Sequence, residues 1–373
     1  MIEIVRVVSK KDKKEFVDFP LRMYKDNKYF APPIYADEMT IFSNKNAYFA
    51  SSESVFFLAK EDGKTVGRIQ GIIQKQYNEI HNEKRLRFTR FDAVDDERVA
   101  KALFDALIEF GKEKQMEILC GPLGYSDLER EGLLVYGFDQ MSTFAEQYNY
   151  PYYEKLIESV GLTKEVEWLE FKVKFPKTKS EKIKRVAERT LEINNLHIAD
   201  PKLSKRKLLK KYADGIFNCL DVCYKELYGT VPFTDEVKKQ VLSQFNLVIA
   251  KKYILVILDE NDEVVAFAFC MPAIGKALQK SSGKLTLPAI VKLLKAIKNP
   301  NVIEFCLIGV VPKYQSKGVN AIALDGIMDM LSKGNISHCE TNLCLDYNSK
   351  ILAQWKYFDA ENHKRRRSYF KKI

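Results

Sequence analysis

The 373-residue sequence lacks any run of about 18 uninterrupted apolar residues, so it predicts no membrane-spanning helix. It has too little Gly (17) and Pro (12) for low-complexity linkers, and its 46% hydrophobic residues exclude an intrinsically disordered chain. The first residues, MIEIVRVVSKKDKK, lack the apolar core of a secretory signal. We therefore expect a globular cytoplasmic protein of about two domains.

The sequence also lacks a pattern for disulfides or metal sites. Its seven cysteines are an odd number, and most lie within apolar runs, as small buried side chains do in a reducing compartment. Cys219 and Cys223 have no second Cys or His pair at zinc spacing, and the four histidines form no ligand pattern. The sequence thus predicts neither disulfides nor a bound metal.

Charge is distributed unevenly along the chain. Residues 1–176 contain 26 Lys and Arg against 30 Asp and Glu, whereas residues 177–373 contain 34 against 20. An acidic half joined to a basic half favours an anionic partner for the basic half. Cofactor phosphates, anionic lipid and nucleic acid all fit this charge, and so does a protein whose charge serves only solubility.

The hydrophobic pattern predicts the same order of elements twice: a hairpin, then strand, helix, strand, helix and strand. In the first half the hairpin falls at 55–73 and the long helix at 97–115. In the second half the hairpin falls at 253–271, followed by an apolar strand at 301–311 and a helix at 318–333. This repetition indicates an internal duplication in an α+β (mixed α/β) fold.

The segment from Val310 to Ala321 carries the strongest indication of chemistry. A buried strand is predicted to end at Pro312, and a tight loop leads from it into an amphipathic helix. The first turn of such a helix offers free N–H groups and the positive end of the helix dipole, which together bind anions. Gly318 allows a phosphate to approach the backbone, and Lys313 adds positive charge.

This segment resembles the acyl-CoA loop of the GNAT superfamily of N-acyltransferases, a strand followed by (Gln/Arg)-x-x-Gly-x-(Gly/Ala) and a helix. Gln315 and Gly318 match the motif, whereas Asn320 stands where the family has Gly or Ala. The resemblance implies that acetyl-CoA or a longer acyl-CoA binds here as a substrate. The residues that it assigns to this cofactor are Val310, Val311, Gln315, Ser316, Lys317, Gly318, Val319, Asn320 and Asn348.

The order of elements resembles a GNAT unit over residues 184–373 and a second, degenerate unit over residues 1–176. The first-half segments FPLRMYKDNKYFAPP and GPLGYSDLEREGLLVYGFD are similar to those of long bacterial GNAT-like proteins. The first-half turn that corresponds to the loop is rich in carboxylates, which would repel a pyrophosphate. We therefore expect two GNAT-like units in tandem, joined at 174–183.

GNAT chemistry needs a base that takes a proton from the substrate ammonium. Glu304 lies eleven residues before Gln315, a spacing similar to that of the basic Glu in histone acetyltransferases of the superfamily. Burial in the apolar strand would raise its pKa toward a useful range, and the alternative is a structural Glu at a strand end. The family's leaving-group Tyr corresponds here to Trp355, and Tyr357 falls on another helix face, so the acid stays unassigned.

Three functions are compatible with this resemblance. The first is an acyl-CoA-dependent N-acyltransferase with an amine acceptor, for which a long-chain or lipid-like substrate is one option. The second is a Fem-like aminoacyltransferase that uses charged tRNA, although nucleic acid is the less favoured partner of the basic half. The third is a non-catalytic GNAT-like binding protein, since Asn320 and Trp355 depart from the family pattern.

Two basic segments complete the predictions. Residues 286–298 combine regularly spaced Leu, Ile and Val with Lys as the sole charged residue, a pattern typical of an amphipathic helix at the inner membrane face. The alternative is a helix packed on its own domain. Residues 364–372 are predicted to form an exposed closing strand with basic flanks rather than a nucleic-acid-binding tail.

Overall fold

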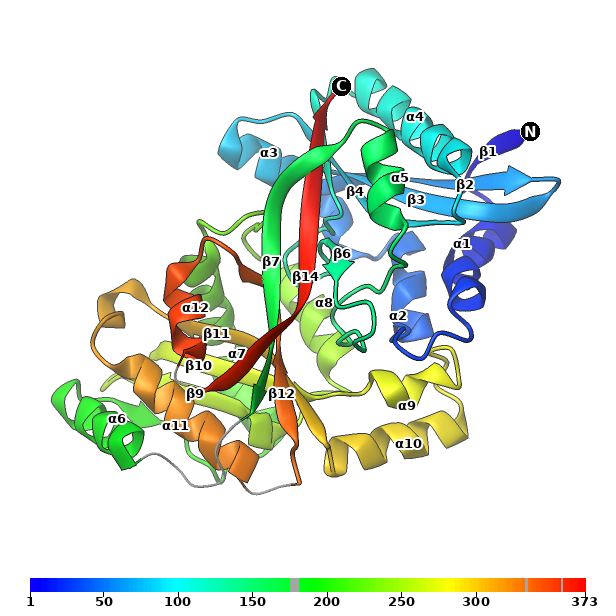
Figure 1. Ribbon diagram of the computed structural model, residues 1–373. Coiled ribbons are helices and arrows are strands. Elements are labelled where there is room, and N and C mark those ends of the chain that lie inside the picture. Colours follow the sequence, from blue (N-terminus) through cyan, green and yellow to red (C-terminus); the bar gives the residue numbers. More distant parts are fainter. Residues whose placement is uncertain (175–180, 333–334, 357) are drawn as a thin grey trace.

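The computed structural model describes residues 1–174, 181–332, 335–356 and 358–373, and its centre is a 14-stranded mixed sheet (Figure 1). The strands of the first half are β1 (Ile2–Arg6), β2 (Ser52–Glu61), β3 (Lys64–Gln74), β4 (Arg85–Ala93), β5 (Ile118–Gly121), β6 (Leu133–Tyr136) and β7 (Thr163–Lys174). Those of the second half are β8 (His197–Ile198), β9 (Ile254–Leu258), β10 (Val264–Pro272), β11 (Val302–Val310), β12 (His338–Thr341), β13 (Cys344–Leu345) and β14 (Asp359–Lys372).

Helices surround this sheet, and several begin at side chains that cap them. Those of the first half are α1 (Lys10–Met23), α2 (Tyr35–Met39), α3 (Lys75–His81), α4 (Glu97–Glu113) and α5 (Tyr153–Ser159). Those of the second half are α6 (Glu181–Ile193), α7 (Lys205–Tyr224), α8 (Asp235–Phe245), α9 (Gly275–Gln279), α10 (Leu287–Lys298), α11 (Val319–Ser332) and α12 (Ser349–Trp355). Ser204 begins α7 and Thr234 begins α8, because each side chain accepts an N–H of the first turn.

The predicted duplication is confirmed by the topology. In the first half, parallel β4 and β5 are joined by α4, and in the second half parallel β11 and β12 are joined by α11. In each half a hairpin comes before this strand–helix–strand arrangement: β2 with β3 in the first half and β9 with β10 in the second. The mixed α/β fold class is therefore confirmed. The boundary between 1–176 and 184–373 stays a prediction, and residues 175–180 of the junction lie outside the described residues.

The two halves exchange their last strands. The order of the sheet is β1-β2-β3-β4-β5-β14-β7-β12-β11-β10-β9-β8. The final strand of the chain, β14, thus pairs with β5 of the first half, and β7 of the first half pairs with β12 of the second. β7 and β14 run antiparallel side by side through the middle of the molecule (Figure 1). Each half is consequently completed by a strand of the other.

Each half has its own core, and a third cluster joins them. The first core packs α4 and α5 on β2–β5, and the second packs α6 and α11 on β9–β12. The joining cluster brings Tyr48, Ile72 and Tyr125 of the first half against Phe217 and Phe267 of the second. Because apolar burial is the main favourable term in folding, these contacts hold the halves together.

Two sequence predictions require correction. β14 is a central strand rather than an exposed one, since Lys364, Arg366 and Ser368 are fully buried. The basic residues suggested an exposed strand because the carboxylates that pair with them, Glu170 and Glu340, lie on strands far away in the sequence. The strand that the repeated order predicts after the helix at 318–333 is also interrupted, because β12 ends at Thr341 and β13 begins at Cys344.

Candidate active site

A cleft opens where the parallel strands β11 and β12 diverge. The strands keep register from Val302 opposite His338 to Phe305 opposite Thr341, and the last contact is the N–H of Asn342 donating to the Phe305 carbonyl at 2.9 Å. Beyond this point a cavity of about 420 Å³ lies between the end of β11 and residues 342–345. The end of α7 and the start of α12 close its sides.

The predicted acyl-CoA loop borders this cleft. Val310, Gln315, Ser316, Asn320 and Asn348 all line it. The Gln315 side chain donates to the Val310 carbonyl at 3.0 Å and accepts from Lys350 Nζ at 3.2 Å, which fixes the turn between β11 and α11. Asn348 caps α12 by accepting the Ile351 N–H. These predicted residues therefore come together at one site.

The other predicted cofactor residues, Val311, Lys317, Gly318 and Val319, belong to the loop but do not line the cleft. Val319 is buried in the second core, and the Val311 N–H donates to the Val265 carbonyl at 2.9 Å. Lys317 lies over the Tyr314 ring on the exposed side. Gly318 has a φ of +83°, and a Cβ atom there would lie 2.7 Å from Thr190 Oγ1. Glycine at 318 is thus required by both the backbone and α6.

The donor set of the cleft suits an anionic cofactor such as a CoA thioester. The loop leads directly into the first turn of α11, and Lys350 adds a cation at the same end of the cleft. The opposite end, at Cys306 and Leu307, lies at the point of strand divergence. A β-bulge at Cys306 shifts the register between β10 and β11, so that Cys306 has no opposite residue on β10. Such a bulge leaves backbone groups outside the hydrogen bonds between the strands.

Glu304 lies on β11, two residues before Cys306, and its side chain is buried. The Phe144 N–H donates to both of its carboxylate oxygens, at 3.0 and 3.2 Å. Burial raises the pKa of Glu304 to about 8, and the nearby carboxylates Glu340 and Glu146 add to the rise. Glu304 is not among the residues that line the cleft, whereas its neighbour Cys306 is.

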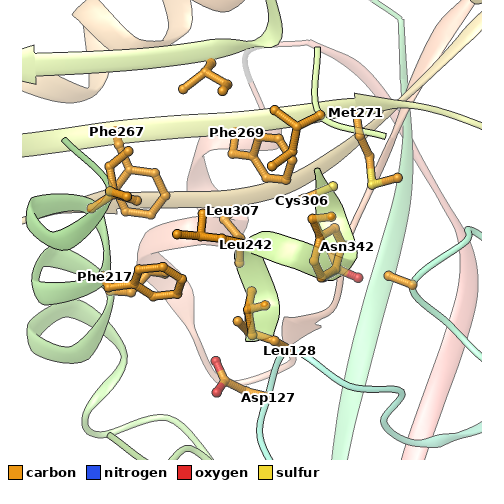
Figure 2. Close-up of a pocket in the computed structure, with 18 of the residues that line it drawn as sticks. Asp127, Leu128, Phe217, Leu242, Phe267, Phe269, Met271, Cys306, Leu307 and Asn342 are labelled. Carbon is orange, nitrogen blue, oxygen red and sulfur yellow. The ribbon is translucent and has the colours of Figure 1, made fainter. Parts of the chain in front are cut away.

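A second, apolar cavity of about 110 Å³ continues from the cleft (Figure 2). It lies between α7, α8 and the sheet, where Phe267 and Phe269 of β10 face Phe217 of α7. The two cavities share four residues: Asp127, Cys306, Leu307 and Asn342. A group seated at the strand divergence would therefore have a polar cleft on one side and an apolar cavity on the other.

Two acidic residues that the sequence did not single out line the cleft. Asp127 lines both cavities, and Glu131 lines the cleft. Burial raises the pKa of Asp127 to about 6, and burial together with Asp127 raises the pKa of Glu131 well above its ordinary value. The segment GPLGYSDLEREGLLVYGFD contains both, so the motif was visible, but its place beside the second half was not.

Trp355, which stands where the family has its leaving-group Tyr, lies away from the cleft. Its side chain is buried, with its ring 5.6 Å from Phe305 and 6.4 Å from Phe171, and it does not line the cleft. Tyr357 lies outside the described residues. The residue that protonates the leaving thiolate thus stays unassigned. Within the described ranges, no group of three or more His, Cys, Asp or Glu could hold a metal ion.

Comparison with solved structures settles the fold. The chain matches a tandem GNAT protein from the clavulanic acid biosynthesis pathway with a TM-score of 0.57 and 10% identity, over 100% of this chain and 98% of the other. The chain has a tandem GNAT fold. It also matches the GCN5-related glucosamine N-acetyltransferase region of a fungal multi-domain β-N-acetylglucosaminidase, with a TM-score of 0.58 and 9% identity over 38% of that chain.

Two known proteins resemble this tandem GNAT chain in sequence over most of its length. It is 26% identical to Protein YghO of Escherichia coli (strain K12), over 98% of this chain and 94% of that protein. It is 24% identical to the bacterial ceramide synthase of Caulobacter vibrioides (strain NA1000 / CB15N), over 84% of this chain and 82% of that protein. No protein-family profile matches the chain.

The tandem GNAT fold accounts for the position of the loop. The resemblance that was based on Gln315 and Gly318 is confirmed at the level of the fold, and the loop lies in the second unit, at the open end of the diverging strands. The first unit contributes Asp127, Glu131 and Trp168 to the same cleft. The site is therefore shared between the two units.

Proposed function

We propose that this tandem GNAT protein is an acyl-CoA-dependent N-acyltransferase. The observation that carries this proposal is the cleft between diverging β11 and β12, which ends at a loop with Gln315, Gly318 and the first turn of α11. The CoA phosphates would bind the loop and Lys350, and the pantetheine would follow the end of β11. The thioester would then reach Cys306 and Leu307.

The chemistry proposed at this point is acyl transfer to an amine. The acceptor ammonium loses one proton to a base, and the free nitrogen forms a C–N bond with the thioester carbonyl carbon. The C–S bond breaks, and the second proton leaves with the sulfur as CoA thiol. Backbone N–H groups at the β11 bulge would stabilise the oxyanion of the tetrahedral intermediate.

The apolar cavity supports an acyl group longer than acetyl. Most of its lining side chains are apolar and come from α7, α8 and β10, although Asp127, Glu129 and Glu146 also line it. It begins where the thioester would lie. Each methylene placed there would gain about 0.8 kcal/mol relative to water. We therefore assign the cavity to the acyl chain, in accord with the resemblance to a protein named as a ceramide synthase.

Glu304 is retained as the proposed base. Its raised pKa, to about 8, is suited to proton transfer near neutral pH, since general bases work best when their pKa lies near the working pH. Its oxygens accept from the Phe144 N–H and it lines neither cavity, so the acceptor proton would have to be relayed to it. Asp127 is the second carboxyl group placed for this role, because it lines both cavities directly.

Native mass spectrometry of the freshly purified protein tests the proposal. We expect a retained CoA thioester, whose mass gives the acyl length, and calorimetry should show CoA binding to the stripped protein. Binding of tRNA with no CoA binding would favour the Fem-like alternative. CoA binding without thiol release from any acyl-CoA in the presence of amines would favour the non-catalytic alternative.

A further inference from the structure

Two acidic side chains and one amide that line the cleft present unpaired oxygens. Asp127 Oδ1, Glu131 Oε1 and Asn342 Oδ1 are shielded from solvent, and none has a hydrogen-bond partner among the described residues. Asp127 and Asn342 line both cavities, and Glu131, which is only 5% exposed, lines the cleft. Buried oxygens without donors cost free energy, so a structural role does not explain them.

Several polar groups around these oxygens are bonded to other acceptors. The guanidinium of Arg87 donates to the carbonyls of Gly124 and Gly229, at 3.1 and 3.0 Å. Lys350, at the loop end of the cleft, donates to Gln315. Three hydroxyl groups that line the cleft donate elsewhere: Tyr224 to Ile308, Tyr228 to Glu165 and Thr230 to Leu227. A ligand in the cleft that carries several donors would supply the missing hydrogen bonds.

The other charged groups around Asp127 and Glu131 are mostly acidic. Asp221 acts on Asp127, while Glu129 and Glu146 act on Glu131, and Arg87 is the cation that opposes them. A ligand that brings positive charge and several N–H donors would relieve both the repulsion and the missing hydrogen bonds. A primary ammonium carries one positive charge and three donors, whereas an alcohol offers one donor and a quaternary ammonium none.

We propose that Asp127 and Glu131, with the Asn342 amide oxygen, form the binding site for the primary ammonium group of the acceptor. This inference rests on the proposed function, whose substrate class it narrows to primary amines. The site places the acceptor nitrogen beside Cys306 and Leu307, where the thioester is expected. In this proposal the second unit binds the phosphates through its loop, and the first unit supplies both acidic side chains.

Calorimetry on the full-length protein tests this site with three probes of one chain length: n-octylamine, n-octanol and octyltrimethylammonium. All three probes carry the same octyl chain, so only the head group differs. We expect octylamine to bind at least tenfold more tightly than the other two. Asp127→Asn and Glu131→Gln should each weaken octylamine binding at least tenfold. The matched controls Asp214→Asn and Glu226→Gln, both exposed and outside the site, should leave it unchanged.

Thermal stability and CoA affinity separate this site from the fold and from the proposed function. Both site variants should melt no lower than the wild type, because each removes an unpaired buried carboxyl group. If a variant fails to fold, Asn342→Leu provides the same test without a charge change. Equal binding of octylamine and octanol, or unchanged binding in all three variants, would overturn the ammonium site. Loss of the proposed function would appear instead as absence of CoA binding to the wild type while amine selectivity persists.

Discussion

Lys364 and Glu170 form an ion pair with no solvent exposure on either side chain, with Nζ 2.9 Å from Oε2. Lys364 lies on β14 and Glu170 on β7, so the pair joins the two strands that the halves exchange. Lys364 also bonds Glu340 at 2.8 Å, and Arg366 bonds Glu170 at 2.7 Å. Burial acts to raise the pKa of Glu170, but the two cations hold it below its ordinary value. These charges fix the register of the central strands.

This pair leads to a prediction about stability. Lys364→Met leaves Glu170 and Glu340 buried with fewer partners, and we expect it to lower the free energy of unfolding by about 3–5 kcal/mol. Denaturant unfolding measures the change. Lys372→Met, on the exposed end of the same strand, is the control and should change stability by less than about 0.5 kcal/mol. Equal stability of Lys364→Met and the wild type would show that the pair does not hold the exchanged strands.

Glu304 gives a prediction in which pH decides the outcome. The pKa of its carboxyl group is raised from an ordinary 4.5 to about 8 on folding. The folded state thus binds the proton more tightly, and the stability that Glu304 contributes falls as pH rises from 4.5 to 8. Glu304→Gln cannot ionise, so its stability relative to the wild type should increase by up to about 4 kcal/mol between pH 5 and pH 8. A pH-independent difference in unfolding free energy would contradict the raised pKa.

The same variant tests the proposed role of Glu304 in catalysis. We expect Glu304→Gln to keep CoA affinity and to lower turnover by about 10²–10⁴, with a smaller loss at high pH, where the acceptor is already neutral. Asp127→Asn, assayed in parallel at saturating amine because Asp127 is also proposed to bind the acceptor, shows which carboxyl group takes the proton. If Glu304→Gln turns over normally while Asp127→Asn does not, Glu304 is a structural residue.

Lys350 is predicted to contact the CoA phosphates. The loop glycine is less useful for this test, because its positive φ and its contact with Thr190 make any substitution there a fold defect. Lys350→Glu reverses an exposed charge at the loop end of the cleft and should weaken CoA binding about tenfold. Lys356→Glu, at the other end of α12 and also exposed, is the matched control. Calorimetry with CoA should show no difference for the control, and equal affinities in both variants would remove Lys350 from the site.

The apolar cavity predicts a limit on acyl length. Cys223 and Tyr224, at the end of α7, line the cleft, so Ala213 lies about 15 Å away along the helix. Ala213→Phe would fill the far part of the cavity that Ala213 lines. We expect binding of long acyl-CoAs to weaken at least tenfold while acetyl-CoA binding stays unchanged. A uniform loss across all chain lengths would indicate a folding defect, and no loss would place the acyl chain elsewhere.

Helix α10 supports the predicted membrane contact with an exposed apolar stripe. Leu287, Val291 and Leu294 are 81%, 67% and 52% exposed, and their spacing places them on one helix face. No helix in the described part of the chain is long and apolar enough to cross a bilayer, so any contact would be interfacial. Exposed lysines on the same helix would attract anionic headgroups, each contributing about 1 kcal/mol.

Vesicle cosedimentation tests this contact. The protein should sediment with anionic vesicles at low salt and less at high salt, because exposed charges are screened. Changing Lys292, Lys295 and Lys298 to Glu should abolish sedimentation, whereas the same change at the exposed Lys202, Lys207 and Lys210 should not. If the protein ignores anionic vesicles at low salt, α10 has no membrane role.

Local features of the chain were open to prediction from the sequence. The hairpins, the long helices and the strand–loop–helix at Gln315 and Gly318 follow from hydrophobic period, turn residues and glycine, which act over a few residues. The approach of a phosphate to Gly318 stays a prediction, whereas its positive φ and its contact with Thr190 are reasons for glycine that the folded chain adds.

The sequence by itself therefore determined two repeated units, a phosphate-type loop in the second and an apolar setting for Glu304. The tertiary structure alone decided that β14 enters the first half and β7 the second, and that Asp127 and Glu131 face the loop's cleft. The physical reason is separation along the chain: Lys364 lies 194 residues from Glu170, and strand pairing carries no local signal of its partner. A basic stretch looks exposed until the carboxylates that neutralise it are brought to it by folding.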